Sequence, residues 1–219
     1  MRNIAQPQAL AFGLDHPVIF KEISMNTRIL LTTALVALLT SAPGCSLKPQ
    51  NLRIAPEVVK AVQAPIGGGK SVGLRVSDSR ADKKLGEVGD PDRKMVDVRM
   101  DADPSPVIYE RLKQAMIGLG FSVEPYNDTM DRTLDIKIVN LQLKSIKKPL
   151  TFETVLRAQV GARAVNSNAH YDRQFNVKTR KDGVAPSYEK ESTMLVNTAM
   201  TQVLEDLLAD EELFALLAR

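Results

Sequence analysis

The decisive part of the sequence is a pair of long segments, TLDIKIVNLQLKSI at residues 133–146 and TFETVLRAQVGARAV at residues 151–165. Hydrophobic and polar residues alternate along both segments, which is typical of β-strands that are buried on one face and hydrated on the other. In the first segment the alternation changes phase near Val139–Asn140, which predicts a β-bulge there. Two such strands in succession indicate an antiparallel sheet.

Shorter elements flank these two strands. Alternating residues predict strands at 71–76, 95–100, 121–124 and 171–180, a polar loop at 77–92, and turns at 166–169 and 181–183. Hydrophobic residues at helical spacing predict helices that begin at Ser105, which would cap the first, at Ser192, and after Asp210. This order, β-β-α-β-β-β-β-α-α, indicates a single α+β (mixed α/β) domain. We expect a largely antiparallel sheet with the helices packed on one face.

The only cysteine in the 219 residues, Cys45, ends a stretch with the order of a bacterial secretory signal. Arg28 precedes an apolar run at 29–39, and small residues lead up to Gly44. The run has about 11 residues, whereas a membrane-spanning helix needs about 20, so a retained anchor helix is not expected. We expect cleavage between Gly44 and Cys45 and attachment of lipid to the Cys45 thiol.

This signal divides the chain into a mis-assigned extension, a signal peptide, a flexible tether and a periplasmic domain, which we place at 1–24, 25–44, 45–70 and 71–219. Translation is expected to begin at Met25, because the polar residues before it do not belong to a signal. Proline and glycine punctuate the tether, as is typical of extended spacers. Its apolar patch at 54–62 is expected to dock on the domain or to pair as an edge strand.

Composition limits the classes of partner. The chain has 29 Lys and Arg against 26 Asp and Glu, a net charge of +3, and the two signs are interspersed. This balance does not indicate a nucleic-acid partner. With its single cysteine used for lipid, the domain would have no disulfide and would depend on its core alone. Because tryptophan is absent and aromatic residues make up 5% of the chain, we expect an aliphatic core.

Two motifs invite a functional interpretation and do not support it. Residues 64–71, APIGGGKS, are similar to a phosphate-binding loop, but they precede a strand, whereas such a loop must open a helix. We expect a hinge there. His170 stands alone in a turn, without the converging ligands of a metal site or the partners of a hydrolase nucleophile. We expect no enzyme activity, no catalytic residue, no metal and no cofactor.

The segment after the first strand is a stronger candidate. Asp78 and Arg80 place a carboxylate and a guanidinium near a strand end, and loops carry binding residues more often than cores do. The sequence therefore predicts a partner-binding loop at these two residues. A solvated loop with no binding role is the alternative.

These features together resemble the YajG-type family of bacterial outer-membrane lipoproteins, a group of uncharacterised function. The resemblance rests on the order of the lipidated cysteine and tether, the strand at 71–76, Asp78-x-Arg80, Leu-Gly-Phe at 119–121, the alternating strand at 156–164, and the apolar helix at 193–208. Ala42 and Pro43 depart from the usual cleavage motif. The family supplies no catalytic residues. Ser46, rather than Asp, follows the cysteine, and the resemblance then implies anchoring in the outer membrane.

We expect a non-catalytic protein that is anchored to the membrane by its N-terminal lipid and binds an envelope protein or a peptidoglycan-related partner. The alternative is a small-ligand carrier. Its pocket would lie between sheet and helices, where Ala158, Gly161, Ala162 and Ala164 could leave space. The sequence leaves the oligomeric state open.

Overall fold

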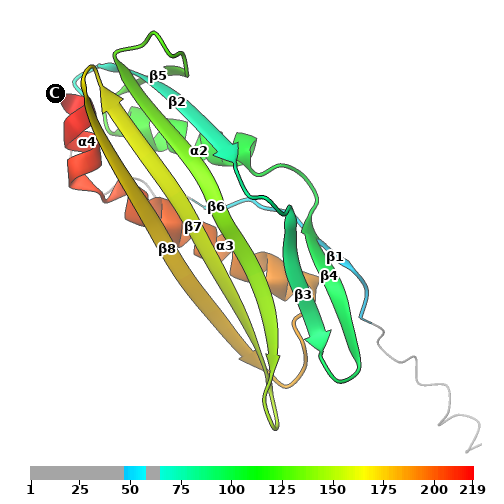
Figure 1. The fold of residues 1–219 in the computed structure, drawn as a ribbon. Helices are drawn as coiled ribbons and strands as arrows, with labels where there is room; N and C mark the ends of the chain where they lie inside the picture. Colours follow the sequence, from blue (N-terminus) through cyan, green and yellow to red (C-terminus); the bar gives the residue numbers. More distant parts are fainter. Residues whose placement is uncertain (1–46, 58–64) are drawn as a thin grey trace, which may run out of the picture. The chain divides into compact units, whose positions relative to one another are not determined.

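A computed structural model describes residues 47–57 and 65–219. These residues lie within one compact unit, Ser46–Arg219. The expected extension, the signal peptide and Cys45 lie outside the described residues. Within the described residues, eight strands form one sheet: β1 Gln50–Leu52, β2 Ser71–Asp78, β3 Lys84–Asp90, β4 Lys94–Met100, β5 Ser122–Pro125, β6 Arg132–Lys147, β7 Phe152–Asn166 and β8 Ala169–Gly183. Three helices of the same described part accompany it: α2 Ser105–Gly118, α3 Glu189–Leu208 and α4 Glu211–Ala218 (Figure 1).

Strand β6 is the centre of the sheet. Along one edge it pairs antiparallel with the whole of β7, which pairs antiparallel with β8. Along its other edge it pairs in parallel with β2 and then with β3. Parallel pairs also join β2 to β5 and β1 to β4, while β3 and β4 form an antiparallel hairpin. The expectation of a largely antiparallel sheet is therefore wrong, because the crossover through α2 brings the chain back beside β2 in the same direction.

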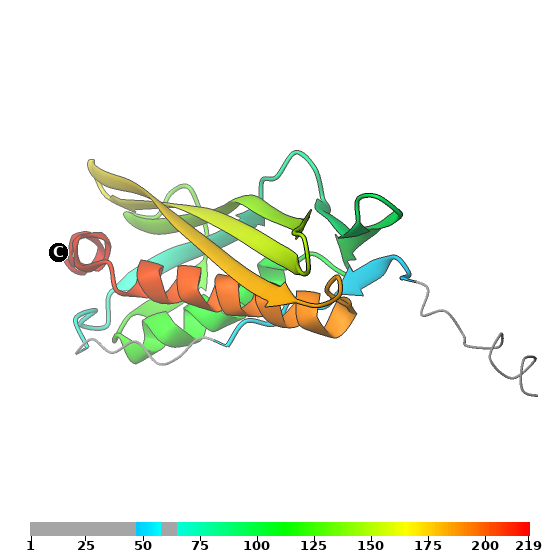
Figure 2. The same cartoon turned by 90° about the horizontal axis from the view of Figure 1, so that it is seen from below.

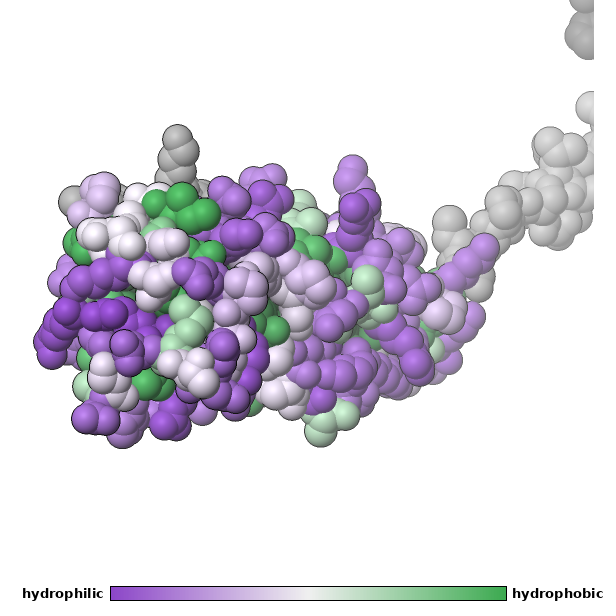
Figure 3. All heavy atoms as spheres, turned by 90° about the horizontal axis from the view of Figure 1, so that it is seen from above, coloured by the Kyte–Doolittle hydropathy of each residue, from purple (hydrophilic) through white to green (hydrophobic). Residues whose placement is uncertain are grey.

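The expected single α+β domain and its aliphatic core are confirmed. Helices α2 and α3 cover the same face of the sheet (Figure 2). The apolar stripe of α3 is buried at Val196, Ala199, Met200, Val203, Leu204, Leu207 and Leu208. Helix α2 adds Ile108, Leu112 and Met116. On the face shown in Figure 3, hydrophilic residues predominate and hydrophobic residues gather in small separate groups.

The bulge predicted near Val139 is confirmed, since the register between β6 and β7 shifts between Ile138 and Asn140. The polar loop predicted at 77–92 is wrong over its second half, which forms β3. Leu85 and Val88 of that strand are buried, although the sequence between them suggests a turn. The turn predicted at 181–183 is also wrong, because β8 continues to Gly183.

The cap predicted for the first helix is wrong as well. Pro104 occupies the N-cap position of α2, and Ser105 is the first helical residue and makes no capping hydrogen bond through its side chain. The Asp103 carboxylate caps the start of the helix instead, because it accepts a hydrogen bond from the Ser105 backbone N–H at 2.9 Å. A carboxylate at this point also suits the positive end of the helix dipole.

Part of the segment expected to be a flexible tether belongs to the folded domain. Residues 50–52 form β1, and Ile54 is 5% exposed. The Asn197 side chain on α3 then accepts a hydrogen bond from the Ala55 N–H at 2.8 Å. The patch expected at 54–62 thus docks at its start, and the strand pairing comes from the residues just before it. The folded domain includes Gln50 rather than beginning at Ser71.

Candidate functional site

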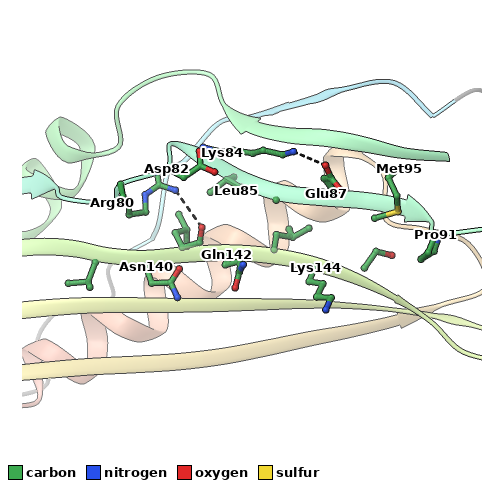
Figure 4. Close-up of a pocket in the computed structure, with 16 residues that line it drawn as sticks. Arg80, Asp82, Lys84, Leu85, Glu87, Pro91, Met95, Asn140, Gln142 and Lys144 are labelled. Carbon is green, nitrogen blue, oxygen red and sulfur yellow. Dashed lines mark hydrogen bonds and ion pairs between the residues drawn. The ribbon is translucent and has the colours of Figure 1, made fainter.

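Strands β2 and β3 pair with the same edge of β6, one after the other, and a gap in the sheet, here called the division, separates them. Strand β2 pairs with β6 as far as Ile138, and β3 begins to pair at Leu143. Between them, residues 139–142 pair with β7 alone, and the bulge falls in this interval. An open cleft of about 720 Å³ occupies the division (Figure 4). Its lining includes Arg80, Leu85, Glu87, Met95, Asn140, Gln142 and Lys144.

A buried ion pair holds one side of this cleft. Arg80 donates from Nε and Nη2 to the two carboxylate oxygens of Asp78, each at 2.9 Å. The side chains are 4% and 5% exposed, respectively. Arg80 Nη1 also donates to the backbone oxygen of Leu141 at 3.5 Å. The guanidinium therefore ties the end of β2 to the part of β6 that has no partner strand on this edge.

The charge of Asp78 is stabilised where it is buried. Burial by itself raises the pKa of Asp78, but hydrogen bonds from Arg80 and Lys83 outweigh burial and hold it below its ordinary value. Lys83 Nζ lies 3.2 Å from the Asp78 carboxylate and is itself 59% exposed. Asp78 therefore remains a carboxylate at neutral pH and does not supply a proton donor.

The sequence placed Asp78 and Arg80 correctly near a strand end. The two side chains are buried there and form an ion pair with each other instead of being solvated. Partner binding at these two residues stays a prediction. Lys84 is likewise engaged, at 2.7 Å from Glu87 and 2.6 Å from Asp97, and its hydrogen bonds, first with Asp97, raise its pKa.

The polar groups that the cleft offers a ligand come from β6, which sequence reasoning missed. Asn140, Gln142 and Lys144 line the cleft, and their side chains engage in no hydrogen bond or ion pair within the described part of the chain. Two amides and one ammonium can bind a polar ligand by hydrogen bonds and charge. The phase change at Val139 was the one sequence signal for this place, because bulges are over-represented next to functional sites.

The outer face of the sheet, opposite the helices, carries a second feature absent from the sequence predictions. We call Lys144, Arg157, Lys178 and Arg180 the basic face. Arg157 and Lys178 are direct cross-strand partners, and Arg180 stands opposite Val155, which in turn stands opposite Lys144. All four are exposed and make no ion pair with another residue that the structure describes. Like charges placed directly opposite each other destabilise a sheet, so folding alone does not favour this arrangement.

An ion pair also lies on the outer face of the sheet. Arg75 donates to both oxygens of Asp135 at 3.0 and 2.8 Å and stacks 3.9 Å from the centre of the Tyr126 ring. Burial raises the pKa of Asp135, and the bond to Arg75 more than offsets this, so that the pKa lies below its ordinary value. This pair joins β2 to β6 next to the division.

The phosphate-loop-like motif and His170 do not line the cleft. The glycines of the phosphate-loop pattern donate backbone hydrogen bonds to the turn after α2, from Gly67 to Leu119 and from Gly69 to Gly120, each at 2.8 Å. Strand β2 follows them, so no helix opens there. His170 is exposed, with its imidazole 3.9 Å from Asp172. Among the described residues, no group of three or more His, Cys, Asp or Glu is arranged to hold a metal ion.

The small residues at which a small-ligand carrier would have its pocket lie mostly in the core. Ala158, Ala162 and Ala164 are buried in the same hydrophobic core as the stripe of α3. Their small size lets α3 pack close to the sheet. Gly161 lies on the other face, where an added Cβ would be 3.6 Å from a methyl group of Val139.

Comparison with known proteins bears on this architecture. A family described as uncharacterised lipoproteins matches residues 56–218. The chain belongs to that family. The resemblance to YajG-type lipoproteins is thereby confirmed. No curated protein matches it in sequence. Among the described residues of the lipoprotein, every helix is too short or too polar to cross a bilayer.

Solved structures extend the comparison to the fold. Protein XCC0632 from Xanthomonas campestris, of the family DUF330, is similar with a TM-score of 0.52 at 11% identity, over 77% of this chain and 95% of that one. Lipoprotein GNA1162 from Neisseria meningitidis is similar with a TM-score of 0.32 at 12% identity, over 62% of this chain and 98% of that one. The first likeness shows a shared fold, and the second is too weak to carry an argument.

Proposed function

We propose that this lipoprotein is a non-catalytic binding module of the bacterial cell envelope, anchored in the outer membrane by lipid on Cys45 with its domain in the periplasm. Membership of a lipoprotein family supports the anchor, together with the signal-like order of residues that ends at Cys45. The partner is an envelope protein or a peptidoglycan-related molecule. Its site is the cleft beside β6.

The observation that carries this proposal is the division of the sheet. Between β2 and β3, one edge of β6 lacks backbone hydrogen bonds to a neighbouring strand. This gap leaves an open cleft that is lined by the unengaged side chains of Asn140, Gln142 and Lys144. The charges of Asp78 and Arg80 serve to hold the edges of that cleft. Such a site suits recognition of a polar partner, because positioned amides and a charge give orientation and specificity.

Two measurements on intact cells test the proposal. The intact mass of the processed protein should equal the chain from Cys45 onward plus its acyl chains, and an unacylated, freely soluble protein contradicts the anchor. A photo-crosslinking residue in place of Gln142 should capture a reproducible envelope partner. The matched control replaces Asn168, an exposed residue in the β7–β8 turn. Equal capture at both positions, or none at Gln142, contradicts the cleft as the binding site.

A further inference from the structure

Three turns gather at one end of the sheet, which we call the hairpin end. They are the β3–β4 turn at 91–93, the β6–β7 hairpin at 148–151 and the β8–α3 loop at 184–188. Lys147 joins the first two, since its ammonium lies 2.9 Å from Asp90 and 2.8 Å from Asp92. The last register pair of β7 and β8 joins Phe152 to Gly183, which places the hairpin beside the loop.

The start of the described chain lies at this same end. Gln50 donates from its side chain to the backbone oxygen of Ser187, in the β8–α3 loop, at 2.9 Å. Since β1 runs parallel to β4, residues 47–49 lead back toward the β3–β4 turn. Four residues separate Cys45 from Gln50, and the five residue-to-residue steps between the two span at most about 17 Å. The lipid proposed for Cys45 would therefore keep the membrane surface within that reach of Gln50.

The hairpin end exposes large aliphatic side chains where a membrane contact would need them. Leu150 is 89% exposed and Val184 is 88% exposed. They flank the register pair of Phe152 and Gly183, so they stand on neighbouring turns. Single exposed hydrophobic residues are ordinary. Two that are almost wholly exposed, at the end nearest the lipid, form an apolar tip.

The charges near this tip complement an anionic surface. Lys144 and Arg180 lie two residues before Ile146 and Asp182 on β6 and β8, a rise of about 7 Å. Arg157 and Lys178 form the next row on the same face, two residues further from the hairpin end. The nearby acids Glu153 and Asp182 are both held by Lys148, at 3.1 and 3.0 Å. The basic face thus presents unpaired cations, whereas the acids beside it are engaged.

We infer that the lipoprotein makes a second contact with the bilayer besides its lipid, in which the apolar tip enters the interface and the basic face meets anionic phospholipid headgroups. This inference rests on the proposed lipid anchor. Each Lys or Arg near an anionic surface strengthens the attraction, and the exposed aliphatic side chains leave water for the acyl boundary. The domain then stands with its hairpin end against the membrane.

Site-specific labelling of the processed, acylated lipoprotein tests this contact. Cys45 is the only cysteine and carries the lipid, so Leu150→Cys and Val184→Cys each take a single environment-sensitive fluorophore. Asn168→Cys, in the β7–β8 turn, is the matched control. In vesicles of phosphatidylcholine and phosphatidylglycerol, brominated lipid should quench the labels at Leu150→Cys and Val184→Cys and leave the control label unquenched.

The charge requirement has its own variants. Lys144→Gln combined with Arg180→Gln removes two of the four cations of the basic face, so it should weaken docking about thirtyfold and reduce quenching toward its level in pure phosphatidylcholine. Arg111→Gln combined with Lys113→Gln removes one Arg and one Lys from α2, which packs on β2 and β5 away from the hairpin end, and should change nothing. Intact mass is read first on the same sample. Missing acyl chains refute the proposed anchor and this inference together, whereas acylated protein whose labels stay in water refutes the inference alone and leaves the basic face to a soluble or protein anion.

Discussion

Replacing Arg80 with methionine isolates what the buried ion pair beside the cleft contributes. The two side chains of the pair are 4% and 5% exposed. Methionine is of similar length and uncharged, so Arg80→Met leaves Asp78 buried with Lys83 as its only counter-charge, and Lys83 is largely exposed. Removing one partner of a buried pair costs about 3–5 kcal/mol. For a domain of this size the melting temperature should fall by about 6–20 °C.

The pH dependence of this loss gives a sharper result. In the wild-type protein the pKa of Asp78 is lowered below 3.8, so its stabilising contribution is full above that value and is lost as pH falls through the folded-state pKa. Without Arg80, burial dominates and the pKa of Asp78 in the folded state rises above its unfolded value. The deficit of Arg80→Met relative to the wild type should therefore shrink as pH falls from about 7 to about 4.

Urea unfolding followed by circular dichroism, at several pH values, measures both effects. Adding Asp78→Asn to Arg80→Met removes the stranded charge and should recover part of the lost stability. The matched control is Arg93→Met, in the exposed β3–β4 turn, where Arg93 is 86% exposed and its loss should change little. A loss below about 1 kcal/mol for Arg80→Met, or a deficit independent of pH, refutes the view that this pair is a buried, charged tie across the division.

Three further outcomes follow from single contacts. Gly86→Ala should lower the free energy of unfolding by about 2 kcal/mol or more, because Gly86 has φ +141° and an added Cβ would overlap a backbone oxygen of β6. Gly161→Ala meets only ordinary contacts and should be neutral in the same urea titration. Asp210→Ala removes the carboxylate that caps α4 at 3.0 Å and should cost about 1–2 kcal/mol by thermal denaturation. Asp135→Asn should flatten the fall in stability below about pH 4, since Arg75 keeps the pKa of Asp135 low and that contribution is lost only as pH falls through it.

The long strands could be predicted because their signal is local. Alternation along 133–146 and 151–165 indicates which side chains face the core. The phase change at Val139 predicts where the register between β6 and β7 shifts. The parallel pairing of β2 with β6 has no such local signal, because it depends on where a crossover returns the chain. Strand β3 was missed for a related reason: Gly86 and Gly89, both at positive φ, interrupt its alternation and suggest turns.

The candidate site was predictable only in part. A charged pair near a strand end was visible as Asp78 and Arg80, but its burial follows from β3 and β6 closing around it. The basic face requires the register of three strands, since Arg157 and Lys178 are 21 positions apart in sequence and become neighbours only through pairing. Charges that are interspersed along a chain can therefore still gather on one face of a sheet.

The cleft and the basic face share a side chain, and this connects the two proposals. Lys144 lines the cleft and also belongs to the row that would face anionic headgroups. One ammonium cannot satisfy a polar partner and a phospholipid headgroup equally well at the same time. If the partner in the cleft draws Lys144 away, it weakens the membrane contact, and linkage requires the membrane contact to weaken partner binding by the same factor. If Cys45 carries lipid as proposed, the short chain between Cys45 and Gln50 would keep the domain near the bilayer in either case, so the competition would alter its orientation on the membrane and leave its attachment intact.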